Sequence, residues 1–329
     1  MVRLSDFDTA SQNEPATATA AYSDQISARN RDESQIQRTL INLVPPATLV
    51  AVILFWMFAP RSVTESPWSI VVAGLAVSFF VLGLELILER HEGWRLTRKE
   101  FATDLFYVIL TYTAIGWATE TFADGPLASL KESLGITTPW LIQMPFLVQA
   151  ALVVFLVEFG QYWMHRLMHD WYPAWLTHAP HHHITQLNAM KGAVGNPIEL
   201  FLISLSVVAL FDFDTPALFC GFNLLGVIST YAHANVRSDP PLFYSYIFTT
   251  IRHHSLHHTA LSYEDTRCNY GNSLILLDRI FGTYREGESE IVGQDERKRL
   301  SIYEQFIFPF RPLIEKYKGK RNKPASADN

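Results

Sequence analysis

Long apolar stretches recur along the chain after a polar beginning. Four of them lie in the first half, at residues 40–60, 68–88, 101–123 and 139–156. A helix needs about 20 predominantly apolar residues to cross the hydrocarbon core of a bilayer. The first two stretches are nearly free of charge over that length, which helices of soluble proteins rarely are. The pattern therefore predicts membrane-spanning helices rather than the buried core helices of a large soluble protein.

Two further apolar stretches, near residues 197–214 and 215–232, are separated by the sequence FDFDTP. Their spacing predicts a tight helical hairpin at about 197–232, which either crosses the bilayer or only dips into it. With this pair, the number of crossings is even. Both ends of the chain are then expected on the same side of the membrane.

Basic residues near the ends of the spans predict the orientation. The loop at residues 90–100 contains Arg90, Arg95, Arg98 and Lys99, whereas the loops at 61–67 and 124–138 contain one basic residue each. Loops rich in lysine and arginine stay on the cytoplasmic side. We therefore expect the loop at 90–100, both termini and the histidine-rich region that follows the fourth span to be cytoplasmic.

The composition supports a membrane protein and limits the possible chemistry. Of the 329 residues, 49% are hydrophobic and 18% are charged, whereas soluble domains carry about 25% charged residues. A net charge of −6 argues against general binding to nucleic acid. Two cysteines, Cys220 and Cys268, are too few for a disulfide framework or a zinc ribbon. A metal site would have to use other ligands.

Histidines supply them, because eleven of the twelve lie between residues 165 and 258. Three groups have helical spacing, in the sequences HRLMH, HAPHHH and RHHSLHH, and Pro180 in the second group predicts the start of a new helix there. A further histidine ends the last apolar stretch, in YAHANVR. The candidate metal ligands and catalytic residues are His165, His169, His178, His181, His182, His233, His254, His257 and His258.

This spacing points to a metal centre. Closely packed imidazoles cannot all be protonated, and a metal cation favours the neutral ring with a free lone pair. Nine imidazoles exceed the four ligands of a structural zinc ion and suffice for two metals. Imidazole suits iron, copper, nickel and zinc alike, so the ligand type leaves the metal open. None of the histidine groups has the Glu-x-x-His pattern of soluble di-iron bundles, and the HExxH motif of metalloproteases is absent from the sequence.

Residues 150–285 resemble the fatty acid hydroxylase superfamily of integral-membrane di-iron enzymes, which includes sterol desaturases and lipid hydroxylases. The first box stands here as EFGQYWMHRLMH, with Glu158 in the acidic position. The second stands as HAPHH, followed by QLNA and NPIE. The third stands as HSLHH, followed by NYGNSLILLDRIFGTY, and His233 with Asn235 resembles the extra histidine of the family's last span.

The resemblance implies an all-α, polytopic membrane enzyme with a cytosolic helical cap that holds a histidine-rich dinuclear site. It implies two iron ions as cofactors and the nine histidines as their ligands. The reaction would use O2 and two electrons to attack an unactivated C–H of a lipid, sterol or fatty acyl chain. Hydroxylation and desaturation use the same ligand set, so both remain open. Electrons would come from a separate ferredoxin, cytochrome or reductase.

Two other classes of protein remain possible from the sequence. A non-catalytic metal-handling membrane protein would use histidines as transport ligands but would also place ionisable residues along a pathway through the spans. A zinc hydrolase of lipid head groups would need neither O2 nor a reductant.

Several side chains beside the boxes have an open role. His183 and His253 are either ligands or neighbours of ligands. Glu158 is expected to contact a ligand imidazole or Arg166, because an unpaired carboxylate at the membrane edge is costly. Asn269 and Asp278 are expected either to orient histidines or to cap loop backbone.

The sequence thus predicts four regions. A disordered polar tail covers residues 1–37, transmembrane helices cover 38–150, and the catalytic domain with its membrane hairpin covers 151–285. A basic cytosolic segment covers 286–329.

Overall fold

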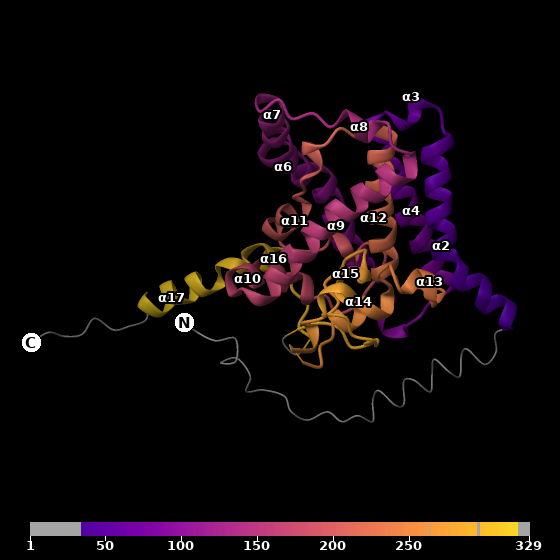
Figure 1. The fold of residues 1–329 in the computed structure, drawn as a ribbon. Helices are drawn as coiled ribbons and strands as arrows, with labels where there is room; N and C mark the ends of the chain where they lie inside the picture. Colours follow the sequence, from indigo (N-terminus) through magenta and orange to yellow (C-terminus); the bar gives the residue numbers. More distant parts are fainter. Residues whose placement is uncertain (1–33, 263, 295–296, 322–329) are drawn as a thin grey trace, which may run out of the picture.

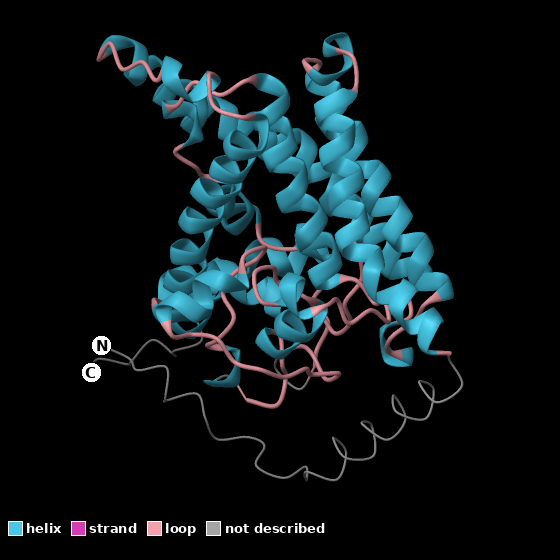
Figure 2. Cartoon of the chain, turned by 45° about the vertical axis from the view of Figure 1, so that its right-hand side comes forward, coloured by secondary structure: helices cyan, strands magenta, loops and turns pink. Residues whose placement is uncertain are grey.

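The computed structural model describes residues 34–262, 264–294 and 297–321, and these residues are almost entirely helical (Figures 1 and 2). Two isolated β-bridges join Glu89 to Val236 and Thr259 to Val292, and no sheet forms among the described residues. The predicted all-helical class is confirmed. The predicted polar tail lies outside the described residues, apart from residues 34–37. These begin the first described helix, at a capping box between Ser34 and Gln37.

Five helical stretches are long and apolar enough to cross a membrane: α2 (Gln35–Phe58), α4 (Pro67–Ile87), Arg98–Ser133, α9 (Phe146–Asp170) and α12 (Thr215–His233). The third is continuous, since π-helical turns at Thr111–Ile115 and Glu120–Asp124 join α5 (Arg98–Leu110), α6 (Gly116–Thr119) and α7 (Gly125–Ser133). By these helices the chain is a multi-pass membrane protein, as the apolar pattern predicts. The shorter α-helices are α3 (Arg61–Thr64), α8 (Pro139–Ile142), α10 (Tyr172–His182), α11 (Pro197–Ser204), α13 (Leu242–Ser245), α14 (Ile251–His257), α15 (Ile275–Phe281), α16 (Ile302–Ile307) and α17 (Arg311–Arg321).

The predicted span at 197–214 is wrong as a helix. Only α11 forms there, with eight residues, and a helix of that length is about 12 Å long. The rest of the stretch is irregular except for a 3-10 turn at Val208–Leu210. Near its end, the Asp212 carboxylate accepts the backbone N–H of Thr138 at 2.6 Å and anchors the segment to the loop before α8. Non-helical backbone is tolerated at membrane depth where protein buries it.

The loops nevertheless divide between two faces as the charge pattern predicts. At one face, Arg61 pairs with Asp214 at 3.0 Å and Lys131 pairs with Asp212, which brings the loops at 61–67 and 124–138 beside the start of α12. At the opposite end of the helices, Arg90 pairs with Asp239 at 2.9 Å. The loop at 90–100 therefore lies on the same face as the histidine-rich segments. That this face is cytoplasmic remains a prediction.

Helix α12 forms the centre of the bundle and packs between α9 on one side and α2 and α4 on the other (Figure 1). The buried indole of Trp56 in α2 donates to Asn223 Oδ1 of α12 at 2.9 Å. On the other side, Gly221 allows α12 to approach Val153 of α9, because a Cβ at Gly221 would lie 2.6 Å from Val153 Cβ. These contacts hold in place the two helices whose last turns carry histidines.

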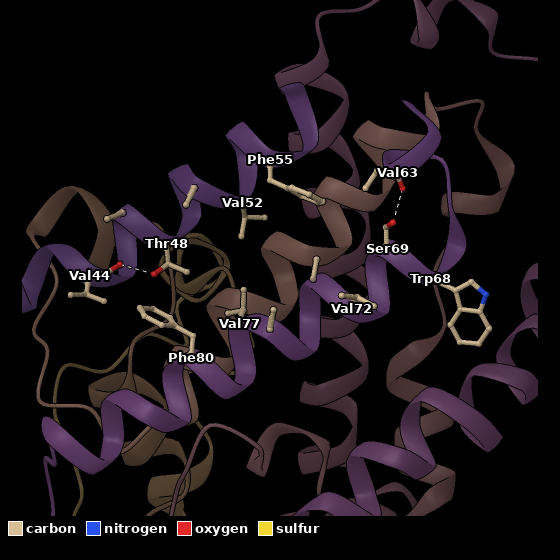
Figure 3. A pocket seen from close by; sticks show the side chains of 14 residues that line it. Val44, Thr48, Val52, Phe55, Val63, Trp68, Ser69, Val72, Val77 and Phe80 are labelled. Atoms are coloured by element: carbon tan, nitrogen blue, oxygen red, sulfur yellow. Dashed lines mark hydrogen bonds between the residues drawn. The ribbon is translucent and has the colours of Figure 1, made fainter. Parts of the chain in front are cut away.

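An open apolar groove of about 850 Å³ lies between α2 and α4 (Figure 3). Its two hydroxyl side chains already bond within the protein: Thr48 donates to the Val44 carbonyl, and Ser69 donates to the Val63 carbonyl. None of the lining residues is a histidine. The groove is therefore separate from the histidine chemistry.

Candidate metal centre

The candidate ligands come from the ends of four helices, which meet at one end of the bundle (Figure 1). The last turns of α9 and α12 supply His165, His169 and His233, α10 supplies the second box, and α14 with its C-cap residue supplies the third. The expected helix start at Pro180 is wrong, since α10 continues through this proline to His182. Proline removes a single backbone hydrogen bond, and the burial of this last turn of α10 offsets that loss.

All nine candidate ligands fall into two buried groups. The first group is His165, His169, His178, His182 and His257, and the second group is His181, His233, His254 and His258. Within each group, one ring nitrogen from every member lies within 4.8 Å of the others. The two groups are adjacent, because the rings of His182 and His258 stack with centroids 4.5 Å apart. Each group could therefore hold one metal ion.

Backbone carbonyls fix the direction of four of these rings through Nδ1. The pairs are His165 with Tyr270 at 2.7 Å, His181 with Val194 at 2.7 Å, His233 with Ser229 at 2.8 Å and His257 with Cys268 at 2.7 Å. A carbonyl only accepts, so Nδ1 of each ring carries the proton and donates it. Nε2 of each ring then keeps its lone pair and points into the group, as in metal-bound histidines.

Glu199 plays the corresponding role for His178, since its Oε1 lies 2.6 Å from His178 Nδ1. The capping box at the start of α11 places this carboxyl, with Oε2 accepting the backbone N–H of Asn196. Burial raises the pKa of Glu199 to about 8, and a nearby cation would favour the ionised form. The local sequence, NPIE, does not by itself show that this carboxylate meets a histidine. The available signal for Glu199 is the Asn-Pro pair that starts a helix, with an acidic residue in its first turn.

Lone pairs face one another inside the groups. His165 Nε2 and His178 Nε2 lie 3.0 Å apart while both Nδ1 atoms face oxygen. Among the described residues, His257 Nε2 and the Nδ1 atoms of His182, His254 and His258 are buried without a hydrogen-bond partner. Such an arrangement is unfavourable without a cation. The residues therefore fit a metal.

Burial lowers the pKa of each candidate ligand outside the long helices, which favours its neutral form. Burial lowers the pKa of His178 to about 3. Burial, and then repulsion from neighbouring imidazoles, holds the pKa of His182, His254, His257 and His258 well below the ordinary value. Metal ligation needs the neutral ring, so binding would release few protons from these residues.

Unlike Glu199, the side chains of Glu158, Asp278 and Asn269 bond to backbone groups rather than to the rings. Glu158 Oε1 accepts the backbone N–H of Ser273 at 2.8 Å, so the expected contact with a ligand imidazole or Arg166 is wrong. Asp278 accepts the N–H groups of Tyr270 and Gly271, and the pKa of Asp278 is raised to about 6 by burial. Asp278 thereby holds the turn whose Tyr270 carbonyl orients His165.

Asn269 also bonds to backbone, donating to the carbonyl of Arg285 at 2.9 Å. His183 and His253 lie outside both groups. His183 packs its ring against Phe308, and His253 Nδ1 lies 3.3 Å from the Thr250 hydroxyl. These two histidines therefore neighbour the centre.

A cavity of about 220 Å³ opens onto both groups. His165 and His178 of the first group and His181 and His233 of the second line it. The remaining wall includes side chains of α9, α11 and α12 that lie toward the middle of the bundle: Gln161, Leu200, Ile203, Leu225 and Ser229. A molecule that enters from the bundle side thus reaches both histidine groups at once.

Comparison with known proteins is consistent with this site. Residues 150–283 match the fatty acid hydroxylase family. The ornithine lipid hydroxylase of Rhizobium tropici is 28% identical over 77% of this chain and 78% of its own length. Human alkylglycerol monooxygenase is 31% identical over 48% of this chain and 35% of its own. The probable Delta(7)-sterol 5(6)-desaturase of Neurospora crassa is 23% identical over 52% of this chain and 48% of its own.

No solved structure matches the chain. The relatives named here are hydroxylases, monooxygenases and desaturases, and the chain is accordingly an oxidoreductase. The matched segment, 150–283, contains both histidine groups and the cavity between them.

Proposed function

We propose that this chain is a membrane-bound di-iron oxygenase of the fatty acid hydroxylase superfamily that hydroxylates an unactivated C–H of a lipid, because residues 150–283 match the fatty acid hydroxylase family and the ornithine lipid hydroxylase aligns over most of the chain. One observation carries the proposal: two buried histidine groups line one cavity whose wall also includes residues of α9, α11 and α12. The nine histidines are the proposed ligands, with the first group at one iron and the second at the other. When bound, the two irons supply the activation of O2 that C–H oxidation requires.

The chain's own residues hold and orient this centre. Four backbone carbonyls and Glu199 keep the Nε2 lone pairs directed inward, so the ligands are arranged before metal arrives. Leu200, Ile203 and Leu225 give part of the cavity wall an apolar surface, which favours contact with aliphatic carbons of a lipid. This placement supports a substrate that comes from the bilayer.

Hydroxylation is favoured over desaturation by the comparisons. The ornithine lipid hydroxylase aligns over most of both chains, whereas the sterol desaturase aligns over about half of each. We propose a separate ferredoxin, cytochrome or reductase as the electron donor and place the histidine groups on the cytoplasmic side, where such donors operate. A lipid desaturase of the same family is the second candidate, supported by the sterol desaturase relatives.

Substitution of single ligands tests the proposal. Alanine at His165, His181, His257 or His258 is expected to abolish formation of the oxidised lipid and to lower bound iron, because each removes one directed lone pair. His183→Ala is the matched control, since His183 is buried beside the centre but outside both groups. Iron is measured in the purified protein by elemental analysis.

Lipids of cells with and without the gene, grown with and without O2, are compared by mass spectrometry. A product heavier by one oxygen that needs O2 supports hydroxylation, and a product lighter by two hydrogens indicates the desaturase. Full turnover in two of the four ligand variants would defeat the ligand assignment. A product that forms without O2 would defeat the oxygenase itself.

A further inference from the structure

Two glycines, Gly192 and Gly226, line the cavity at the histidine groups. Gly226 of α12 lines the cavity, and a Cβ built there would meet no atom within 4 Å. Gly192 also lines it, but a Cβ there would lie 3.2 Å from His233 Cε1. Space beside Gly226 can therefore be filled without moving a candidate ligand, whereas space beside Gly192 cannot.

Polar side chains line the same cavity close to the histidines. Ser229 precedes His233 by one turn of α12, and Gln161 precedes His165 by one turn of α9. Gln161 donates through Nε2 to the Ile203 carbonyl at 3.1 Å, which leaves its Oε1 as an acceptor. The Asn272 amide also lines the cavity. In the described part of the chain, neither this amide nor the Ser229 hydroxyl makes a hydrogen bond within the protein.

An all-hydrocarbon segment would match this wall poorly. Polar groups that are desolvated without a partner cost free energy, so Ser229, Gln161 and Asn272 favour an occupant that bonds to them. Leu200, Ile203 and Leu225 on the same wall favour apolar carbon. The lining thus suits a lipid segment in which a hydrogen-bonding group stands next to aliphatic carbons.

We propose that Gly226 is a specificity-determining residue, which leaves room for a lipid segment carrying an amide, ester or hydroxyl group within a few carbons of the oxidised C–H. This inference rests on the proposed function.

One oxygen atom of O2 enters the C–H bond, and the other leaves as water. The external donor supplies two electrons, and two protons come from solvent.

Filling the space tests the steric part. Gly226→Leu is expected to lower product formation at least tenfold while bound iron stays at the wild-type level, because the leucine fills cavity space beside Gly226, where a Cβ meets no atom within 4 Å. Gly226→Ala is expected to give an intermediate loss. Gly160→Leu is the matched control: Gly160 also has open space within 4 Å, on the neighbouring helix α9, and does not line the cavity.

Product formation is measured in cells that express each variant at equal level, and iron is measured in the purified proteins. Wild-type turnover in Gly226→Leu would overturn the assignment of Gly226. Loss of iron in Gly226→Leu but not in Gly160→Leu would overturn it too, since the residue would then act on the centre rather than on the substrate.

Tandem mass spectrometry of the product tests the chemical part by locating the new oxygen. We expect it within a few carbons of an amide, ester or hydroxyl group of the lipid. An oxygen in mid-chain, remote from any such group, would overturn this inference and leave the proposed oxygenase intact. Absence of any oxidised lipid would instead defeat the proposed function.

Discussion

Among single residues, a carbonyl partner on Nδ1 is shared by candidate ligands and by another buried histidine, and the position of the ring separates them. His165 and His257 give Nδ1–H to a carbonyl and direct Nε2 into the first group. His183 also gives Nδ1 to a carbonyl, that of Ala179 at 2.7 Å, but its ring packs against Phe308 outside both groups. Ring orientation therefore matters as much as residue type.

Glu199 gives a prediction at this scale. Glu199→Gln keeps the shape of the side chain but removes its negative charge. That charge would stabilise a cation bound through His178. Loss of such an outer partner lowers metal affinity about 10–100-fold. Iron retained after graded chelation of the purified protein measures the effect.

The control for this experiment is Glu65→Gln, because Glu65 is exposed and pairs with Arg61 at the opposite face. Equal iron retention in Glu199→Gln and in the wild type would show that the carboxylate does not support the centre.

At the scale of helices, the spacing inside each box explains how two groups arise. In α10, His178 and His182 join the first group, whereas His181 joins the second. In the third box, His254 and His258 join the second group, whereas His257 joins the first. Residues at i+3 and i+4 lie on either side of residue i, about 100° apart around the helix. Each of these two boxes therefore supplies ligands to both groups. The box in α10 gives two histidines to the first group and one to the second, and the third box gives one to the first and two to the second.

The packing of α9 against α12 gives a prediction at this scale. Gly221→Leu should lower the free energy of unfolding by about 1–3 kcal/mol, a typical cost of overpacking. The reason is that the added Cβ would meet Val153 and the Ala150 carbonyl. The apparent Tm in detergent micelles measures it.

Gly83→Leu is the matched substitution, in α4, where a Cβ meets nothing within 4 Å. An equal Tm in the two variants would mean that the close approach of α9 and α12 at Gly221 is not needed for stability.

At the scale of the whole molecule, buried ion pairs tie distant segments together beneath the bundle. Arg90 holds Glu288 through two contacts of 2.5 and 2.7 Å and also pairs with Asp239. Lys191, next to the loop that orients His181, bonds to Asp104 at 2.7 Å. The pairs of Arg90 join the loop after α4, the segment after α12 and the chain beyond α15. The pair of Lys191 joins α5 to the segment before α11. Breaking one partner of a buried pair is strongly destabilising.

The Glu288 pair predicts a dependence of stability on pH. Burial by itself would raise the pKa of Glu288, but the Arg90 guanidinium outweighs it and holds this pKa well below the usual range. The pair therefore stabilises the fold fully above the unfolded pKa of about 4.3. This contribution is lost as pH falls below that value, since the unfolded chain then binds a proton that the folded chain does not.

Glu288→Gln should cost about 3 kcal/mol at pH 7, with a smaller difference from wild type near pH 3. Tm values in detergent at both pH values measure it. A difference that stays constant between the two pH values would contradict the assigned pairing.

The helical class, five of the spans, the division of the loops between two faces and the nine clustered histidines could all be predicted from the sequence. Each of these follows from local quantities: apolar length, charge at span ends, and helical spacing. The broken segment at 197–214 escaped prediction, because hydropathy reports burial and not whether buried backbone is helical. The contact of Glu158 with the backbone of Ser273 also could not be predicted, because the two residues are 115 positions apart in the chain.

Three features follow from long-range packing and not from local pattern: which histidines share a group, which nitrogen of a ring faces the group, and where a cavity meets both groups. These depend on carbonyls and carboxyls from distant segments, such as Tyr270 for His165 and Glu199 for His178. A hydrogen bond between residues 105 positions apart leaves no periodic trace in the chain. It exists because α9, α12 and the loops around them pack at fixed distances.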